Sequence, residues 1–173
     1  YMFPRASGVY GADDYSNYVV DFEPTNRYAA SLRSSHVNKI YYDPTVRYQP
    51  WSNADGSLMN NADPTCAPHN PLNTAAGCRN LTVNNTQTAR WLKSDGTRSS
   101  SQSKTFYPAV YFNYVSGSIN DASSYTEIEI ISSTASYVGG PNRSDCTAAP
   151  NCTYNEEIQN FANWYTYYRS RIL

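Results

Sequence analysis

An amphipathic pattern at the C-terminal end restricts the fold of this chain more than any other feature. The stretch "CTYNEEIQNFANWYTYYRSRIL" places Thr153 and Glu156 at capping-box spacing, which predicts the start of a helix. Apolar side chains then follow at intervals of three and four residues, as on one helix face: Ile158, Phe161, Ala162, Tyr165, Tyr168 and Ile172, widened by Trp164 and Tyr167. Such a wide aromatic stripe must be buried. The preceding loops are polar, so we expect the helix to pack on a β-sheet.

Two segments in the middle of the chain carry the clearest strand patterns. Thr105–Gly117 has aromatic side chains on both faces, and Ser124–Val138 begins with polar and apolar residues in alternation. Glu127 and Glu129 fall on one face of the second segment, as expected for a sheet with one wet face. We expect the two segments to pair as an antiparallel hairpin.

The rest of the chain shows weaker patterns. Extended segments are expected at Tyr15–Pro24, Val37–Tyr42 and Thr45–Tyr48, each near a proline that stops a strand. Asn26–His36 fits either a short helix or an irregular link. Residues 52–104 are polar and rich in Asn, Ser, Thr and Gly, which favours an excursion over the surface.

Four cysteines form two pairs that are close in sequence, Cys66 with Cys78 and Cys146 with Cys152. Each lies among residues typical of loops, so we expect two disulfides and an oxidising compartment. Closing the longer loop contributes on the order of 3 kcal/mol in the chain-entropy model. A metal site made by Cys66, His69 and Cys78 is the alternative, but the sequence offers no convincing fourth ligand.

Composition narrows the class of protein. The 173 residues suit one domain, and a net charge of −1 gives no basic surface for nucleic acid. No stretch is apolar enough to insert into a membrane. The 17 tyrosines suit half-wet layers and adhesive surfaces, or they serve simply as strand formers. The chain opens without Met and ends within its helix, so we interpret it as a piece of a longer secreted protein.

Residues that carry chemistry are sparse. His36 has no triad partners, and Asp13–Asp14 is a lone acidic pair expected to meet solvent. Glu127 and Glu129 share a strand face, as some glycosidase carboxylates do, but no deep site is predicted around them. Trp51 and Trp91 are candidate binding platforms, with small satellite cores as the alternative. We expect no enzymatic activity.

Several stretches resemble a known family in the same order along the chain. "YYDPTVRYQPW", "FYPAVYFNY", "YTEIEI" and "NFANWYTYYRSRI" resemble the N-terminal region of type IV pilus tip-associated adhesins of the PilY/PilC kind, from about residue 37 to residue 173. The resemblance implies a parent protein with an α/β von Willebrand factor A-like domain that carries a large insertion. Residues 1–152 would be the β-rich, loop-rich insertion, and residues 153–173 the first long helix of that domain. The fold class expected for the chain is α+β.

This sequence lacks the Asp-x-Ser-x-Ser metal motif of such domains. Asp55–Met59 and Ser94–Ser100 contain similar letters, but both lie in polar loops. We therefore expect no cofactor or metal within this chain, with a divalent cation in the parent domain.

The function that the resemblance implies is adhesion. The chain would be a non-enzymatic segment of a secreted pilus tip adhesin or pilus biogenesis factor, located at the cell surface on the pilus tip. Its partners would be other parts of the parent protein, the pilus tip complex, and a host or substrate surface. The structural helix face would join the insertion to the A-like sheet through Ile158, Phe161, Trp164, Tyr165 and Tyr168. The alternatives are a carbohydrate-binding module that uses Trp51 and Trp91, and a self-assembling fibre subunit.

Overall fold

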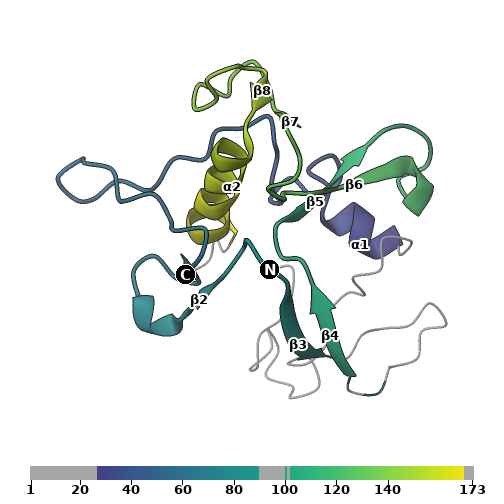
Figure 1. Ribbon diagram of the computed structural model, residues 1–173, viewed down its shortest axis with the longest axis horizontal. Coiled ribbons are helices and arrows are strands. Elements are labelled where there is room, and N and C mark those ends of the chain that lie inside the picture. The colour runs from purple at the N-terminus through teal and green to yellow at the C-terminus, as the bar shows by residue number, and fades with distance from the viewer. Residues whose placement is uncertain (1–26, 90–99, 101, 170–173) are drawn as a thin grey trace.

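The computed structural model describes residues 27–89, 100 and 102–169 (Figure 1). Several expectations lie outside this part of the chain: the strand at Tyr15–Pro24, the Asp13–Asp14 pair, Trp91, and nearly all of Ser94–Ser100. The expected helix end at residues 170–173 lies outside it as well. No helix in the described ranges is long and apolar enough to span a membrane.

The C-terminal helix begins where its capping box predicts. Helix α2 covers Tyr154–Asn163 and continues as a π-helical turn, η4, over Trp164–Tyr168, which gives a described helix of 15 residues. Thr153 is the N-cap: its backbone N–H donates to Glu156 Oε2 at 2.7 Å, and its Oγ1 accepts from Glu156 N at 3.4 Å. The backbone N–H of Arg169 donates to Trp164 O at 2.9 Å, the five-residue spacing of a π-helix.

Four short antiparallel strand pairs make up the β-structure of the described residues. They are β1 (Ala67–Pro68) with β2 (Cys78–Arg79), β3 (Asn85–Ala89) with β4 (Gln102–Phe106), β5 (Val110–Tyr114) with β6 (Tyr125–Glu129), and β7 (Tyr137–Val138) with β8 (Asn151–Cys152). A short helix, α1 (Arg27–Leu32), and two 3₁₀ turns, η2 (Thr74–Ala76) and η3 (Ala122–Ser124), complete the elements. The chain therefore has α+β character.

The hairpin expected in the middle of the chain is confirmed. β5 pairs with β6 so that Tyr111 lies opposite Ile128. However, both predicted strands are too long. The first divides at Pro108, which has no N–H to donate, so that β4 and β5 belong to different hairpins. The second ends at Glu129, and Tyr137–Val138 pairs with β8 instead.

Predictions for the N-terminal half were less successful. Asn26–His36, which the sequence left undecided, contains α1. The strands expected at Val37–Tyr42 and Thr45–Tyr48 are wrong, because this segment consists of turns and irregular backbone. The neighbouring Tyr41 and Tyr42 are both buried, which a strand with one core face does not allow. The polar segment 52–104 does run largely over the surface, but it also contains β3 and the start of β4.

Two clusters of buried side chains share strand β5. On one side, Val110 and Phe112 pack with Ala30 of α1 and Tyr125 of β6. On the other side, Tyr111 faces the main core, and its ring lies 5.4 Å from that of Tyr42. β5 is therefore buried on both faces, between α1 and the core around α2 (Figure 1).

The aromatic stripe of the helix is covered by this chain itself. Tyr42 is fully buried at its centre, with ring centroids 4.9 Å from Phe161 and 5.9 Å from Trp164. Tyr48 and Trp51 pack against the same core from the segment that follows. The expectation that only a β-sheet could bury this stripe is therefore wrong. The tyrosines of the loops and Trp51 supply the apolar surface that regular strands would otherwise supply.

The helix cap leads to a prediction about acid stability. Backbone N–H groups of Thr153 and Thr147 bind the Glu156 carboxylate and hold its pKa at about 2. Because the folded pKa lies below the ordinary value of about 4.3, the ionised cap stabilises the fold above that pH. This stabilisation declines as the pH falls toward 2.

The Glu156→Gln variant should therefore melt below the wild-type chain at pH 7, and the difference should shrink as the pH falls from about 4.3 toward 2. Thermal unfolding followed by circular dichroism between pH 7 and 2 measures this difference. A difference that stays constant down to pH 2 would contradict the assignment.

Candidate functional site

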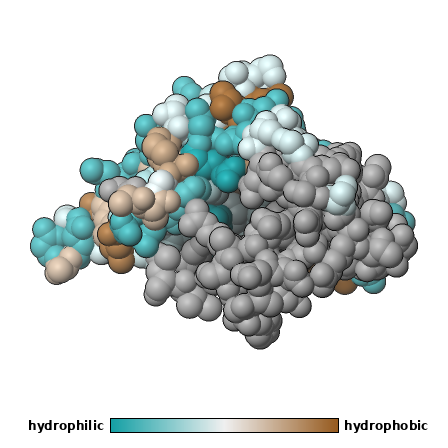
Figure 2. Space-filling view, turned by 90° about the horizontal axis from the view of Figure 1, so that it is seen from below, coloured by the Kyte–Doolittle hydropathy of each residue, from teal (hydrophilic) through white to brown (hydrophobic). Residues whose placement is uncertain are grey.

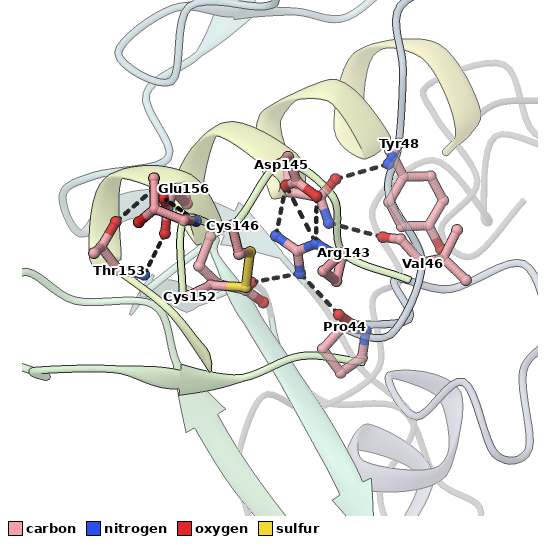
Figure 3. Close-up of a disulfide and its surroundings, with 12 residues drawn as sticks. Pro44, Val46, Tyr48, Arg143, Asp145, Cys146, Cys152, Thr153 and Glu156 are labelled. Atoms are coloured by element: carbon pink, nitrogen blue, oxygen red, sulfur yellow. Dashed lines mark hydrogen bonds and ion pairs between the residues drawn. A yellow bond between two sulfur atoms is a disulfide. The ribbon is translucent and has the colours of Figure 1, made fainter. Parts of the chain in front are cut away.

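A buried ion pair between Arg143 and Glu157 connects helix α2 to two loops that are distant in sequence. Figure 3 shows Arg143 between Asp145 and Pro44. Arg143 has no exposed side-chain surface, and its Nη1 donates to Glu157 Oε2 at 2.7 Å and to Pro44 O at 2.8 Å. Its Nε and Nη2 donate to Asp145, at 3.0 and 2.9 Å. Glu157, also fully buried, accepts a further hydrogen bond of 2.7 Å from the Tyr42 hydroxyl.

The electrostatics of this group favour a structural role. Burial raises the pKa of Glu157, and the charge of Arg143 and the Tyr42 hydroxyl act against that rise. Burial lowers the pKa of Arg143, but the hydrogen bonds that Arg143 donates to Asp145 and Glu157, together with the charges of Tyr42 and Glu157, outweigh this effect, so the pKa is raised overall. Burial also raises the pKa of Tyr42 well above its usual value, so the phenol remains a donor. Every polar group has a partner, and no substrate can reach the carboxylate.

Sequence reasoning missed Arg143, which lies in a Gly- and Pro-rich loop typical of the surface. Gly140, three residues before Arg143, is a residue in the sequence that could have indicated a close contact here. A Cβ placed on Gly140 would lie 2.9 to 3.1 Å from atoms of Thr45, so the two loops approach too closely for any side chain there. This close approach brings Arg143 to Pro44.

Amide side chains of the helix bind the backbone of the irregular segment 46–62. Asn160 Oδ1 accepts from Tyr48 N at 2.7 Å, and its Nδ2 donates to Val46 O at 2.9 Å. One turn later, Asn163 Oδ1 accepts from Ala62 N at 3.0 Å. Its Nδ2 donates to the backbone oxygen of Tyr48 at 3.0 Å. These amides replace the strand neighbour that the segment lacks.

The predicted helix-face residues divide between packing and hydrogen bonding. Ile158 and Phe161 are buried in the core, whereas the polar tips of the other three reach loop atoms. Trp164 Nε1 donates to Ile40 O at 3.2 Å. The half-buried Tyr168 donates through its hydroxyl to Gln49 O at 2.8 Å. The Tyr165 hydroxyl lies 3.0 Å from His69 Nδ1. Tyrosine and tryptophan thus fill the core and bind backbone at the same time.

Both expected disulfides are present. Cys66 is bonded to Cys78 and Cys146 to Cys152, with Cα–Cα distances of 5.0 and 4.9 Å. The alternative metal site at Cys66 therefore does not exist, because its thiols are consumed. Within the described residues, no group of three or more His, Cys, Asp or Glu side chains is placed to hold a metal ion.

The stretch around Asp55, whose letters are similar to a metal motif, forms a local turn. Asp55 Oδ1 accepts from Ser57 N at 3.0 Å and from Ser57 Oγ at 2.6 Å, which lowers the pKa of Asp55. The same arrangement, an Asp or Asn followed two residues later by Ser or Thr, recurs in other loops. It occurs at Asp43, Asp63, Asn80 and Asp121. The letters that resemble a metal motif therefore indicate a local turn.

Of the two candidate binding platforms, Trp51 is described and Trp91 lies outside the described residues. Trp51 is half-buried, and its ring lies 5.9 Å from that of Tyr167. Its backbone oxygen accepts from Met59 N at 2.7 Å, so it sits at the base of the exposed turn 52–58. His36, which the sequence analysis considered as a catalytic residue, stacks on Tyr114 with ring centroids 4.1 Å apart.

Two surface grooves remain as candidates. One, of about 370 Å³, lies beside the helix and is lined by Arg47, Asp145 and several amides. The Asn160 and Asn163 amides in its lining are already used by the loop backbone. The other, of about 480 Å³, follows strand β6 and includes Glu127 and Glu129.

The described surface visible in Figure 2 is largely hydrophilic, with hydrophobic residues in separate patches.

Comparisons with protein-family profiles, with curated proteins and with solved structures find no match to this chain.

The ion pair gives a prediction about stability. Arg143→Met should lower the free energy of unfolding by about 3 to 5 kcal/mol, because Glu157 is left buried without its cation. Arg47→Met is the control, since Arg47 is exposed and makes an exposed hydrogen bond to Ser144, and it should change the free energy of unfolding by less than about 1 kcal/mol. Urea unfolding of both variants measures the difference. Equal losses would contradict a central role for Arg143.

Proposed function

We propose that this chain is a non-enzymatic segment of a secreted type IV pilus tip adhesin or pilus biogenesis factor, and that it acts by protein docking. The observation that carries the proposal is the fixing of long, irregular loops by the side chains of one helix. The sequence resemblance over residues 37 to 173 supplies the family, and the two disulfides support an extracellular or otherwise oxidising location.

The turn 52–58 is the best candidate for a docking surface. All seven residues are exposed, and the turn extends away from the helix in Figure 1. Its base is held by the pairing of Ser52 with Leu58 and by a 2.7 Å bond from Asn53 N to Ser57 O. Tyr167 fixes the chain beyond it, with its hydroxyl 2.6 Å from Asn60 O. A loop that is already ordered loses less conformational entropy on binding.

The wider architecture is part of the proposal. The chain would be the insertion of a von Willebrand factor A-like domain, with the helix continuing into that domain, and a divalent cation would belong to the parent domain. Because the aromatic stripe is covered within this chain, contacts with the A-like sheet would use other surfaces of the helix end. The partners would be the pilus tip complex on one side and a host or substrate surface on the other.

The structure offers little for the carbohydrate-binding alternative. Trp51 is half-buried and packs against Tyr167, and the Asn160 and Asn163 amides of the helix-side groove are already engaged. Protein docking through shaped loops fits these contacts better.

Replacement of Leu58 by Asp tests the docking turn. Leu58 is 52% exposed, so the change should leave the fold intact, while a residue at the centre of a docking surface contributes about 2 kcal/mol or more. Val83, 50% exposed on another loop, provides the matched control as Val83→Asp. Cells that produce the parent protein should attach to a surface at least roughly tenfold less with Leu58→Asp and normally with Val83→Asp.

Sheared pili from the same cells supply the second readout. The wild-type protein and both variants should copurify with the pili in equal amounts. Absence of the protein from purified pili would contradict the pilus assignment. Normal attachment by the Leu58→Asp cells, with the protein present on pili, would contradict only the role of the turn.

A further inference from the structure

Strand β6 has an outer edge that nothing in the described part of the chain pairs with. On the inner side it pairs with β5 in a register bounded by the bonds from Ile130 N to Ala109 O and from Val115 N to Ser124 O. Hydrogen-bonded pairs alternate along an antiparallel ladder. The backbone N–H and C=O groups of Tyr125 and Glu127 therefore point away from β5.

The two edges of the β5–β6 pair differ. Two outward groups of β5 are occupied: Phe112 N donates to Arg33 O at 2.9 Å, and Val110 O accepts from the Tyr41 hydroxyl at 2.6 Å. On β6, the Tyr125 N–H donates to Ala122 O at the near end, and at the far end the Tyr137 hydroxyl lies 3.3 Å from Glu129 O. The open part of the edge is therefore short and centred on Glu127.

The groove along this edge is negatively charged. Its volume is about 480 Å³, and its lining includes Glu127 and Glu129 together with the hydroxyls of Thr134 and Ser136. Among the residues that the structure describes, no basic one lines this groove. The positive charge of the buried Arg33 attracts the Glu127 carboxylate, but Arg33 is not among the residues that line the groove. Glu127 lies opposite Phe112 and Glu129 opposite Val110, so the two carboxylates share the face of the hairpin that packs on α1, at the spacing of alternate side chains on an added strand.

The same charges disfavour pairing between two copies of the chain. An antiparallel β6–β6 contact centred on the open edge would place Glu127 opposite Glu127 or Glu129 of the second copy. Like charges directly opposite one another destabilise a strand pair. A strand with Lys or Arg at alternate positions would instead meet opposite charges.

We propose that the outer edge of β6 binds an extended, basic segment of a partner protein by strand addition, with two Lys or Arg side chains beside Glu127 and Glu129. Backbone hydrogen bonds to Glu127 provide the attachment, and the carboxylates select the sequence. The proposal does not depend on the pilus assignment, because the binding can be measured on this chain whatever its parent protein is.

A designed peptide tests the proposal on the whole chain with both disulfides formed. The ligand is acetyl-Thr-Lys-Val-Lys-Val-Thr-amide. The first control replaces both lysines by glutamate, and the second carries N-methyl groups on both lysine amides, which removes the donors that face Glu127 and its neighbour. Affinity is measured by NMR titration, and hydrogen exchange is measured at the Glu127 amide.

The lysine peptide should bind, slow the exchange of the Glu127 amide, and shift signals of β6 residues. The glutamate and N-methyl peptides should bind at least roughly tenfold more weakly. The Glu127→Gln/Glu129→Gln variant should bind the lysine peptide with an affinity lower by a similar factor. The Glu127→Lys/Glu129→Lys variant should prefer the glutamate peptide.

Three results would overturn the proposal. The Glu127 amide could be protected in the free chain, which would mean that the edge is already paired. The N-methyl peptide could bind as well as the lysine peptide, which would exclude strand addition. The free chain could form dimers that the Glu127→Lys/Glu129→Lys variant abolishes, which would make a second copy the occupant.

Discussion

The structure depends on hydrogen bonds from helix side chains to the backbone of loops that have no strand partner. Buried backbone N–H and C=O groups must be paired, and segments without secondary structure usually meet this need by staying in water. Here the segment 40–62 covers the core of the protein, and Asn160, Asn163, Trp164 and Tyr167 satisfy its backbone. The aromatic helix therefore serves as the central scaffold for irregular chain.

The buried ion pair makes this arrangement specific. Arg143 and Glu157 join the helix to the loop around Pro44, and the adjacent Cys146–Cys152 disulfide holds the Arg143 loop against the start of the helix (Figure 3). A buried pair of this kind adds little net stability over apolar residues of the same volume. Its contribution is to penalise any other placement of the loop, since each alternative leaves a charge buried without its partner.

Local features of the sequence predicted local structure well. The capping box at Thr153, the β5–β6 hairpin and both disulfides were all accessible, because each is set by residues near one another in the sequence. The segment 37–48 was misjudged as strands because its tyrosines have strand propensity, whereas the helix side chains that hold its backbone lie more than 100 residues away. Arg143 was missed for the same reason: its partner Pro44 is 99 residues distant. The open edge of β6 required the register, which the sequence pattern leaves open.

Native-state hydrogen exchange at the Ala62 amide tests the central claim most directly. Ala62 lies in irregular chain, and its N–H donates to Asn163 Oδ1 at 3.0 Å, within the buried core. If the helix side chains hold the loops, this amide exchanges about as slowly as those of β5. In Asn163→Ala it should then exchange much faster, while the β5 amides remain protected. Fast exchange of Ala62 in the wild-type chain, or unchanged protection in Asn163→Ala, would contradict the account.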